Sequence, residues 1–248
     1  MPQHGIGKAM SIKPTHAMVL AAGLGTRMRA GPNDPPKPLV KVGDKTLLGR
    51  MLDRLREAGV TTIIVNVHHL ADQIEGFLSV WGKDKPDVTI HISDERDHIL
   101  ETGGGVKKAL PLLGDYPFYI CNADILWHEA QSNLVHLASE FESANMDACL
   151  MLAPRETAMG YDGLGDYACA PNGLLSRVDG SAPYIFAGVQ IATKAAIAKL
   201  PEGPVSLTHM FNDAITHGRL YGCELQGQWM HVGTPEGRAA AESYLLKV

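Results

Sequence analysis

The sequence predicts an α/β fold in which helices cover both faces of a mostly parallel sheet. Two observations lead to this prediction. Between residues 17 and 153, short apolar or β-branched runs alternate with segments whose apolar residues recur at helical spacing. After Pro154 the pattern changes to short, glycine-rich β segments, which predict a small β-rich subregion in the second half of the chain.

Each predicted element of the first half depends on a local pattern. Residues 17–22 form a short apolar run that ends at a glycine, and residues 61–67 are rich in β-branched side chains, as is typical of buried strands. Leucine and methionine recur at helical spacing in residues 47–55, and Gly59 follows as a stop signal. The other predicted strands are 88–93, 118–121 and 147–153, and the other predicted helices are 71–78, 105–113 and 132–143.

The second half is predicted to contain shorter strands and three helices. The strands are expected at 166–169, 174–178 and 184–191, and the helices at 193–199, 207–217 and 235–247. Because no stretch has the composition of a linker, we expect a single domain over residues 17–248. Residues 1–16 are predicted to be a flexible N-terminal extension, since they lack the continuous apolar run of a secretory signal.

Composition excludes several classes of protein. Of the 248 residues, 45% are hydrophobic and 20% are charged, which is typical of a globular domain and not of a disordered chain. The net charge of −5 gives no basic surface for nucleic acid, and no apolar run approaches the roughly 18–20 residues of a membrane span. The four cysteines are scattered without a metal-binding or disulfide pattern. We expect a cytoplasmic protein that has no nucleic-acid or membrane partner.

The turn after the first predicted strand reads L-A-A-G-L-G-T-R-M, from Leu20 to Met28. Its small residues let backbone N–H groups approach phosphates closely, and Arg27 adds a planar, bidentate phosphate donor. A dinucleotide fingerprint does not fit, because Met28 occupies the third glycine position and no ribose-binding acid ends the next strand. A plain tight turn is the alternative, and the Thr-Arg-Met sequence favours a phosphate-binding loop.

Lys37 lies among prolines in the segment P-P-K-P-L. Because proline fixes φ, we expect a stiff, extended segment that holds the lysine in one place. A lysine held there, downstream of a phosphate loop, suits neutralising the charge of a triphosphate or of an incoming phosphate. A solvated loop lysine is the alternative.

Glu101 precedes three consecutive glycines at the predicted start of a helix. Bare backbone there would let a planar base or a sugar lie close, and the Glu101 carboxylate is a candidate acceptor for a ligand hydroxyl group. A flexible turn is the alternative explanation for such a glycine cluster.

Asp124 follows the predicted strand 118–121, after Asn122 and Ala123. Ligands of open α/β sheets gather beyond the carboxyl ends of the strands, and a carboxylate there suits Mg²⁺. A turn or helix-capping aspartate is the alternative. Near the C-terminus, Thr234 and Pro235 of the segment W-M-H-V-G-T-P are expected to cap and begin the last helix.

Taken in this order, these five segments resemble the sugar-1-phosphate nucleotidyltransferase family. Its signature is L-A-A-G-x-G-T-R-M, then P-K-P-L, a glycine-rich base contact, a strand ending in Asp, and W-x-D-x-G-T near the end; the match spans residues 17–248. The resemblance implies a Rossmann-like, doubly wound sheet of the GT-A-like type, with a nucleotide half at about 17–153 and a sugar half at about 154–248. The chain looks most like the branch of uridylyltransferases that act on N-acetylmuramate 1-phosphate in peptidoglycan recycling.

The resemblance also implies a reaction and its site residues. A sugar 1-phosphate oxygen would attack the α-phosphate of a nucleoside triphosphate in line, and pyrophosphate would leave. The implied catalytic residues are Arg27, Lys37 and Asp124. The implied nucleotide-binding residues are Leu20, Ala21, Ala22, Gly23, Gly25, Thr26, Arg27, Gly103 and Gly104. The implied sugar-phosphate residues are Lys37, Asn122, Glu101, Asp166, Arg177 and Gly188.

One position departs from the family pattern. His231 stands where the family usually has a second metal-binding aspartate. It could ligate a softer ion such as Mn²⁺, leave Mg²⁺ to Asp124 and phosphates, or bind substrate phosphate, and Asp213 is a candidate for a substitute carboxylate. We favour Mg²⁺ on Asp124, with Mn²⁺ as the alternative.

The expected partners are small molecules, a nucleoside triphosphate and a sugar 1-phosphate, for a monomer or small homo-oligomer. UTP and N-acetylmuramic acid 1-phosphate are favoured as the substrates. Transfer of GMP or CMP to another sugar or alcohol phosphate, or a catalytically silent nucleotide-sugar sensor, are the alternatives.

Overall fold

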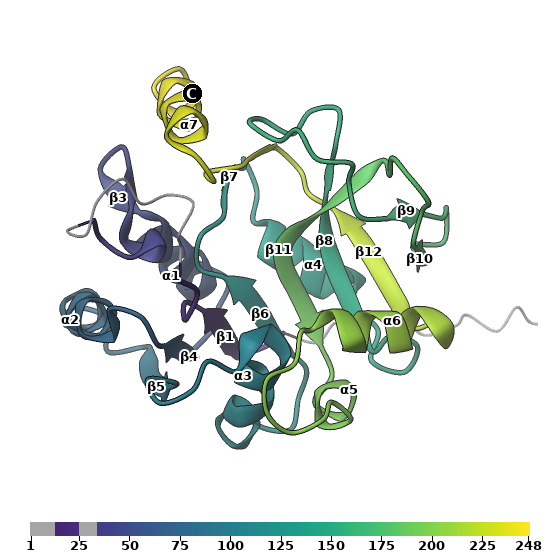
Figure 1. Ribbon diagram of the computed structural model, residues 1–248, viewed down its shortest axis with the longest axis horizontal. Helices are drawn as coiled ribbons and strands as arrows, with labels where there is room; N and C mark the ends of the chain where they lie inside the picture. Colours follow the sequence, from purple (N-terminus) through teal and green to yellow (C-terminus); the bar gives the residue numbers. More distant parts are fainter. Residues whose placement is uncertain (1–12, 25–33) are drawn as a thin grey trace, which may run out of the picture.

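A computed structural model describes residues 13–24 and 34–248 (Figure 1). Its centre is a seven-stranded sheet in the order β12-β8-β11-β6-β1-β4-β5. These strands are β1 (His16–Leu20), β4 (Thr62–Val67), β5 (Thr89–Asp94), β6 (Phe118–Asn122), β8 (Ala148–Pro154), β11 (Tyr184–Ala192) and β12 (Leu220–Glu224). Only β11 runs antiparallel to its neighbours in this sheet, which confirms the predicted mostly parallel fold.

Helices cover both faces of the sheet. The seven α-helices of the described chain are α1 (Leu47–Glu57), α2 (Ala71–Gly82), α3 (Glu101–Ala109), α4 (Asn133–Glu140), α5 (Lys194–Ala198), α6 (Thr208–Thr216) and α7 (Pro235–Leu245). In β1, Ala17 and Val19 pack with α1, α2 and α4, whereas Met18 packs with α3, α5 and α6. Successive strand residues point to opposite faces, so the two apolar clusters lie on opposite sides of the sheet.

The remaining elements of the described chain are short strands and 3-10 turns. They are η2 (Lys37–Leu39), β2 (Lys41–Val42), β3 (Lys45–Thr46), η3 (Leu110–Leu112), β7 (Leu126–His128), β9 (Ala168–Cys169), β10 (Leu175–Ser176) and β13 (Gln228–Met230). A third apolar cluster contains Val42, Leu126 and Met230 together with Ala241 of α7. The Thr234 side chain accepts a hydrogen bond from the Gly237 N–H at 3.1 Å, and Pro235 begins the helix, as the sequence predicts.

The predicted start of the helix at residue 105 is wrong, because α3 begins at Glu101. The backbone N–H groups of Gly103 and Gly104 donate to the Val205 carbonyl at 2.7 and 3.0 Å. A Cβ on Gly104 would lie 2.3 Å from the Gly203 carbonyl oxygen. The glycines are therefore inside the helix, where they allow the backbone of the loop before α6 to approach closely.

The extended segment predicted around Lys37 is also wrong. Lys37–Leu39 forms a 3-10 turn, in which the Leu39 N–H donates to the Pro36 carbonyl at 2.8 Å. The φ that proline imposes suits the first turn of such a helix as well as an extended chain. Strands β7, β12 and β13 were not predicted. Two of them have three residues each, and β12 contains Gly222, which weakens a strand pattern. In the described part of the chain, no helix combines the length and apolarity needed to cross a bilayer.

Candidate active site

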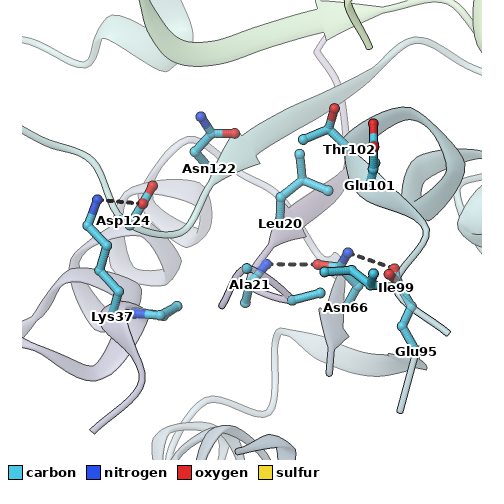
Figure 2. A pocket seen from close by; sticks show the side chains of 13 residues that line it. Leu20, Ala21, Lys37, Asn66, Glu95, Ile99, Glu101, Thr102, Asn122 and Asp124 are labelled. Carbon is cyan, nitrogen blue, oxygen red and sulfur yellow. Dashed lines mark hydrogen bonds and ion pairs between the residues drawn. The ribbon is translucent and has the colours of Figure 1, made fainter. Parts of the chain in front are cut away.

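A cavity of about 250 Å³ opens where the carboxyl ends of β1, β4 and β6 meet the start of α3 (Figure 2). Leu20 and Asn122 end their strands, and Asn66 is the next-to-last residue of β4. Parallel strands bring such end residues together at one edge of the sheet. The cavity is lined by Leu20, Ala21, Ala22, Gly23, Lys37, Pro38, Asn66, Glu95, Ile99, Glu101, Thr102, Asn122 and Asp124.

A partly buried ion pair lies on one side of the cavity. The Lys37 ammonium group is 2.7 Å from a carboxylate oxygen of Asp124, and the two side chains are 15% and 36% exposed. The η2 turn places the lysine, and the residues after β6 place the aspartate. A cation and a carboxylate next to each other can bind a phosphate oxygen and a metal ion respectively.

A buried hydrogen-bonded chain lies on the other side (Figure 2). The Ala21 N–H donates to the Asn66 side-chain oxygen at 2.7 Å, and the Asn66 amide donates to Glu95 Oε1 at 2.7 Å. Glu95 Oε2 accepts from the Leu100 N–H at 3.0 Å. Asn66 and Glu95 are only 2% and 1% exposed, so these bonds link the end of β1 to the start of α3 away from solvent.

Glu101 stands at the mouth of the cavity. It is exposed and has a φ of +57°, a left-handed conformation that is unusual for a residue with a Cβ. Its neighbour Thr102 also lines the cavity, but the Thr102 hydroxyl accepts a hydrogen bond from the Leu207 N–H at 2.9 Å. The Glu101 carboxylate can therefore accept from a ligand, and the Thr102 hydroxyl keeps its O–H donor.

Gly188 lies beside Asn122 across the β11–β6 pairing. It falls at the irregularity between Phe186 and Gln190 and has a φ of +85°. A Cβ there would lie 3.2 Å from the Asn122 amide nitrogen and 2.7 Å from Ile125. A glycine is therefore required where β11 passes the edge of the cavity.

Like Gly188, the predicted sugar-side residues Asp166 and Arg177 do not line the cavity. An Asp166 carboxylate oxygen accepts from the Phe186 N–H at 2.8 Å, which fixes it to β11. The Arg177 guanidinium lies 4.4 Å from the ring centroid of Tyr167 and donates to Asn212 at 3.4 Å. Both side chains have structural partners outside the cavity.

His231 belongs to an aromatic cluster. Its ring centroid is 6.1 Å from that of Tyr161 and 5.9 Å from that of Trp229. Asp213, the candidate substitute ligand, lies on α6 with one oxygen 3.5 Å from the His217 ring nitrogen. Among the residues that the structure describes, no group of three or more His, Cys, Asp or Glu side chains could hold a metal ion.

The remaining predicted residues fall into two groups. Gly25, Thr26 and Arg27 lie outside the described residues. Gly103 and Gly104 are buried against the segment before α6, and the helix packing explains them without a ligand.

Asn66 and Glu95 line the cavity but are not among the site residues predicted from the sequence. A signal for Asn66 was present, because it is a polar residue near the end of the apolar strand T-T-I-I-V-N-V. Nothing comparable marks Glu95, which stands among the charged residues of the segment S-D-E-R-D. It is part of the site only because β5 pairs with β4 in register, with Val67 opposite Asp94.

Comparison with known proteins places this site in a family. Residues 17–183 match the MobA-like NTP transferase domain. The N-acetylmuramate alpha-1-phosphate uridylyltransferase of Caulobacter vibrioides is 44% identical over 96% of this chain and 100% of that protein. The protein of the same name from Neisseria meningitidis serogroup B is 34% identical over 88% of this chain and 93% of that protein.

A solved structure agrees with the fold. The UDP-glucose pyrophosphorylase from Acinetobacter baumannii superimposes with a TM-score of 0.78 at 20% sequence identity, over 93% of this chain and 92% of that chain. The motifs, the cavity at the strand ends and the sequence matches agree with one another. The chain therefore belongs to the MobA-like NTP transferase family and is a nucleotidyltransferase, as its motifs predict.

Proposed function

We propose that this enzyme condenses UTP with N-acetylmuramic acid 1-phosphate to give the UDP-sugar and pyrophosphate. A sugar-phosphate oxygen forms a bond to the α-phosphorus of UTP, and the bond between that phosphorus and the oxygen bridging to the β-phosphate breaks. The observation that carries the proposal is the Lys37–Asp124 pair at 2.7 Å, at the strand-end cavity beside the backbone of Ala21 to Gly23. The 44% identity to a uridylyltransferase supports the choice of substrates.

In this reaction the protein positions charged groups and neutralises their charge. The Lys37 ammonium group would meet the charge that develops on the α-phosphate, and its 15% exposure strengthens that interaction relative to bulk water. The small side chains of Ala21, Ala22 and Gly23 would let the nucleotide lie against the backbone. Gly25, Thr26 and Arg27 would hold the β- and γ-phosphates of the leaving pyrophosphate.

Asp124 fits a Mg²⁺ ion, because Mg²⁺ usually takes one or two carboxylates and completes its shell with phosphate oxygens and water. The Asp124 carboxylate is 36% exposed and faces the same cavity as Lys37. When bound, the ion would neutralise negative charge on the phosphates. His231, whose ring contacts those of Tyr161 and Trp229, is not needed for that ligand set.

The sugar would lie toward Glu101 and Asn122, which line the cavity, and toward Gly188 beside them. Asp166 and Arg177 would act on this side only by shaping β11 and its neighbours. We place the enzyme in the cytoplasm, in peptidoglycan recycling, on the basis of this substrate. The nucleotide half would then be residues 17–153 and the sugar half residues 154–248.

The test is pyrophosphate release with UTP, GTP, CTP, ATP and dTTP, each combined with a panel of sugar 1-phosphates and with Mg²⁺ or Mn²⁺. The panel contains N-acetylmuramic acid, N-acetylglucosamine, glucose, mannose and a heptose. Turnover confined to UTP and N-acetylmuramic acid 1-phosphate supports the proposal. Turnover with another pair of substrates contradicts the substrate assignment but still agrees with a nucleotidyltransferase reaction. If folded protein still binds a nucleotide but releases no pyrophosphate with any pair, the enzymatic role is contradicted and a nucleotide-sugar sensor is favoured.

A further inference from the structure

Asn66 and Glu95 form a polar pair that the reaction as described does not use. Both line the cavity, yet they are only 2% and 1% exposed. Within the described part of the chain Glu95 has no ion-pair partner, and its two oxygens accept from the Asn66 amide and the Leu100 N–H. Burying a carboxylate without a cation is costly, so these hydrogen bonds must be kept for the fold to tolerate it.

The pair holds a strained junction. Leu100 donates its N–H to Glu95, and its carbonyl accepts from the Val205 N–H at 3.1 Å. The next residue, Glu101, has the left-handed φ of +57°. A residue with a Cβ keeps this conformation only where its surroundings fix it, and the bonds on both sides of Leu100 do so.

Because Gly105 has no side chain, it leaves room for the Asn66–Glu95 pair. A Cβ at this position would lie 2.7 Å from Glu95 Oε1 and 2.8 Å from the Asn66 amide nitrogen. The third glycine of the motif is therefore explained by the pair, as the first two are explained by the loop before α6. The glycine motif, the pair and the start of α3 form one packed unit.

We propose that Asn66 and Glu95 are positioning residues for nucleotide binding. Asn66 fixes the Ala21 N–H at the end of β1, and Glu95 fixes the start of α3, so the pair sets the spacing of two sides of the cavity. Neither residue acts on the reacting atoms. The inference depends on the proposed function, because this spacing affects activity only when a ligand contacts both sides.

Reversal of the hydrogen-bond polarity tests the proposal. In Asn66→Asp two carboxylates face each other, and in Glu95→Gln an amide N–H₂ group meets either the Asn66 donor or the Leu100 donor. The double variant restores every bond, because Asp at 66 accepts from Ala21 and from Gln at 95, which still accepts from Leu100. Each single variant is expected to raise KM for the nucleoside triphosphate about tenfold or more. The KM of the double variant is expected to return to within about threefold of the wild-type value.

Two exposed positions provide matched controls. Asn172→Asp and Glu140→Gln make the same chemical changes at exposed sites and are expected to leave KM unchanged. A double variant no better than the worse single variant overturns the proposal. Single variants that lower the thermal midpoint but leave KM unchanged also overturn it, since the pair would then serve only stability.

Amide hydrogen exchange gives a readout that does not depend on turnover. Exchange at Ala21 and Leu100 is expected to be faster in both single variants and to return to the wild-type rate in the double variant. If the wild type releases no pyrophosphate, the proposed function fails, and nucleotide affinity measured by titration takes the place of KM. Unchanged exchange in the single variants overturns the positioning role whatever the activity.

Discussion

The two sides of the cavity differ in how firmly their polar groups are held. Lys37 and Asp124 form a solvent-accessible ion pair, with side chains 15% and 36% exposed. Asn66 and Glu95 are almost fully buried, and their side chains bond to each other and to the backbone N–H groups of Ala21 and Leu100. Partly exposed charges can exchange one partner for another at small cost, whereas buried polar groups cannot. This difference suggests that one side carries out the chemistry and the other maintains the shape of the site.

The largest effect is expected on the side with the ion pair. Lys37→Met should lower kcat by about 100-fold or more, because the charge that stabilises the transition state is lost. Lys41→Met, at an exposed position of β2, is the matched control and should keep kcat. Steady-state pyrophosphate release measures both variants. A raised KM with unchanged kcat would assign Lys37 to ground-state binding only.

On the opposite side of the cavity, substitutions should change the free energy of unfolding. Gly104→Ala places a Cβ 2.3 Å from the Gly203 carbonyl oxygen, so unfolding free energy should fall by about 1–3 kcal/mol. Gly76→Ala is the control, because that helical position has nothing within 4 Å and should gain up to about 1 kcal/mol. Urea denaturation measures both values. Equal effects at the two positions would mean that α3 does not pack as closely as described.

A substitution of Glu101 is expected to affect both activity and stability, because its side chain is exposed at the cavity and its backbone has a strained φ. Glu101→Gly should raise the unfolding free energy by about 1 kcal/mol by relieving the left-handed φ, and should raise KM for the sugar 1-phosphate. Leu70→Gly relieves a φ of +54° at the start of α2 and should give the stability gain alone. An unchanged sugar KM in Glu101→Gly would remove Glu101 from the substrate site.

The smallest effect is expected for metal preference at position 231. Because its ring packs against those of Tyr161 and Trp229, His231 should not determine which metal ion is used. In His231→Asp, the ratio of activity with Mg²⁺ to activity with Mn²⁺ should therefore stay within about twofold of the wild-type ratio. The free energy of unfolding should fall by about 1 kcal/mol, because the ring packing is lost. A shift of this ratio toward Mg²⁺ would identify His231 as a ligand and contradict a site held by Asp124 and phosphates.

The parts of this molecule that follow a local pattern could be predicted from sequence. Strand β8 is a continuous apolar run, β4 is rich in β-branched residues, and Asp124 lies two residues after the end of the apolar strand β6. The start of α3 could not be predicted, because the low helix propensity of glycine argues against a helix there. In the structure, close packing against Gly203 requires glycine inside that helix. The Asn66–Glu95 bond could not be predicted either, since it joins residues 29 positions apart through the β4–β5 register.

The central claim is that nucleotide binds at the strand-end cavity and engages Lys37. A crystal structure with a non-hydrolysable UTP analogue and Mg²⁺ tests it most directly. The nucleotide is expected against the backbone of Ala21 to Gly23, with phosphate beside Lys37 and with Asn66 and Glu95 unmoved. Nucleotide bound elsewhere, for example in the cavity of about 660 Å³ between Lys41 and Arg238 of α7, would contradict it.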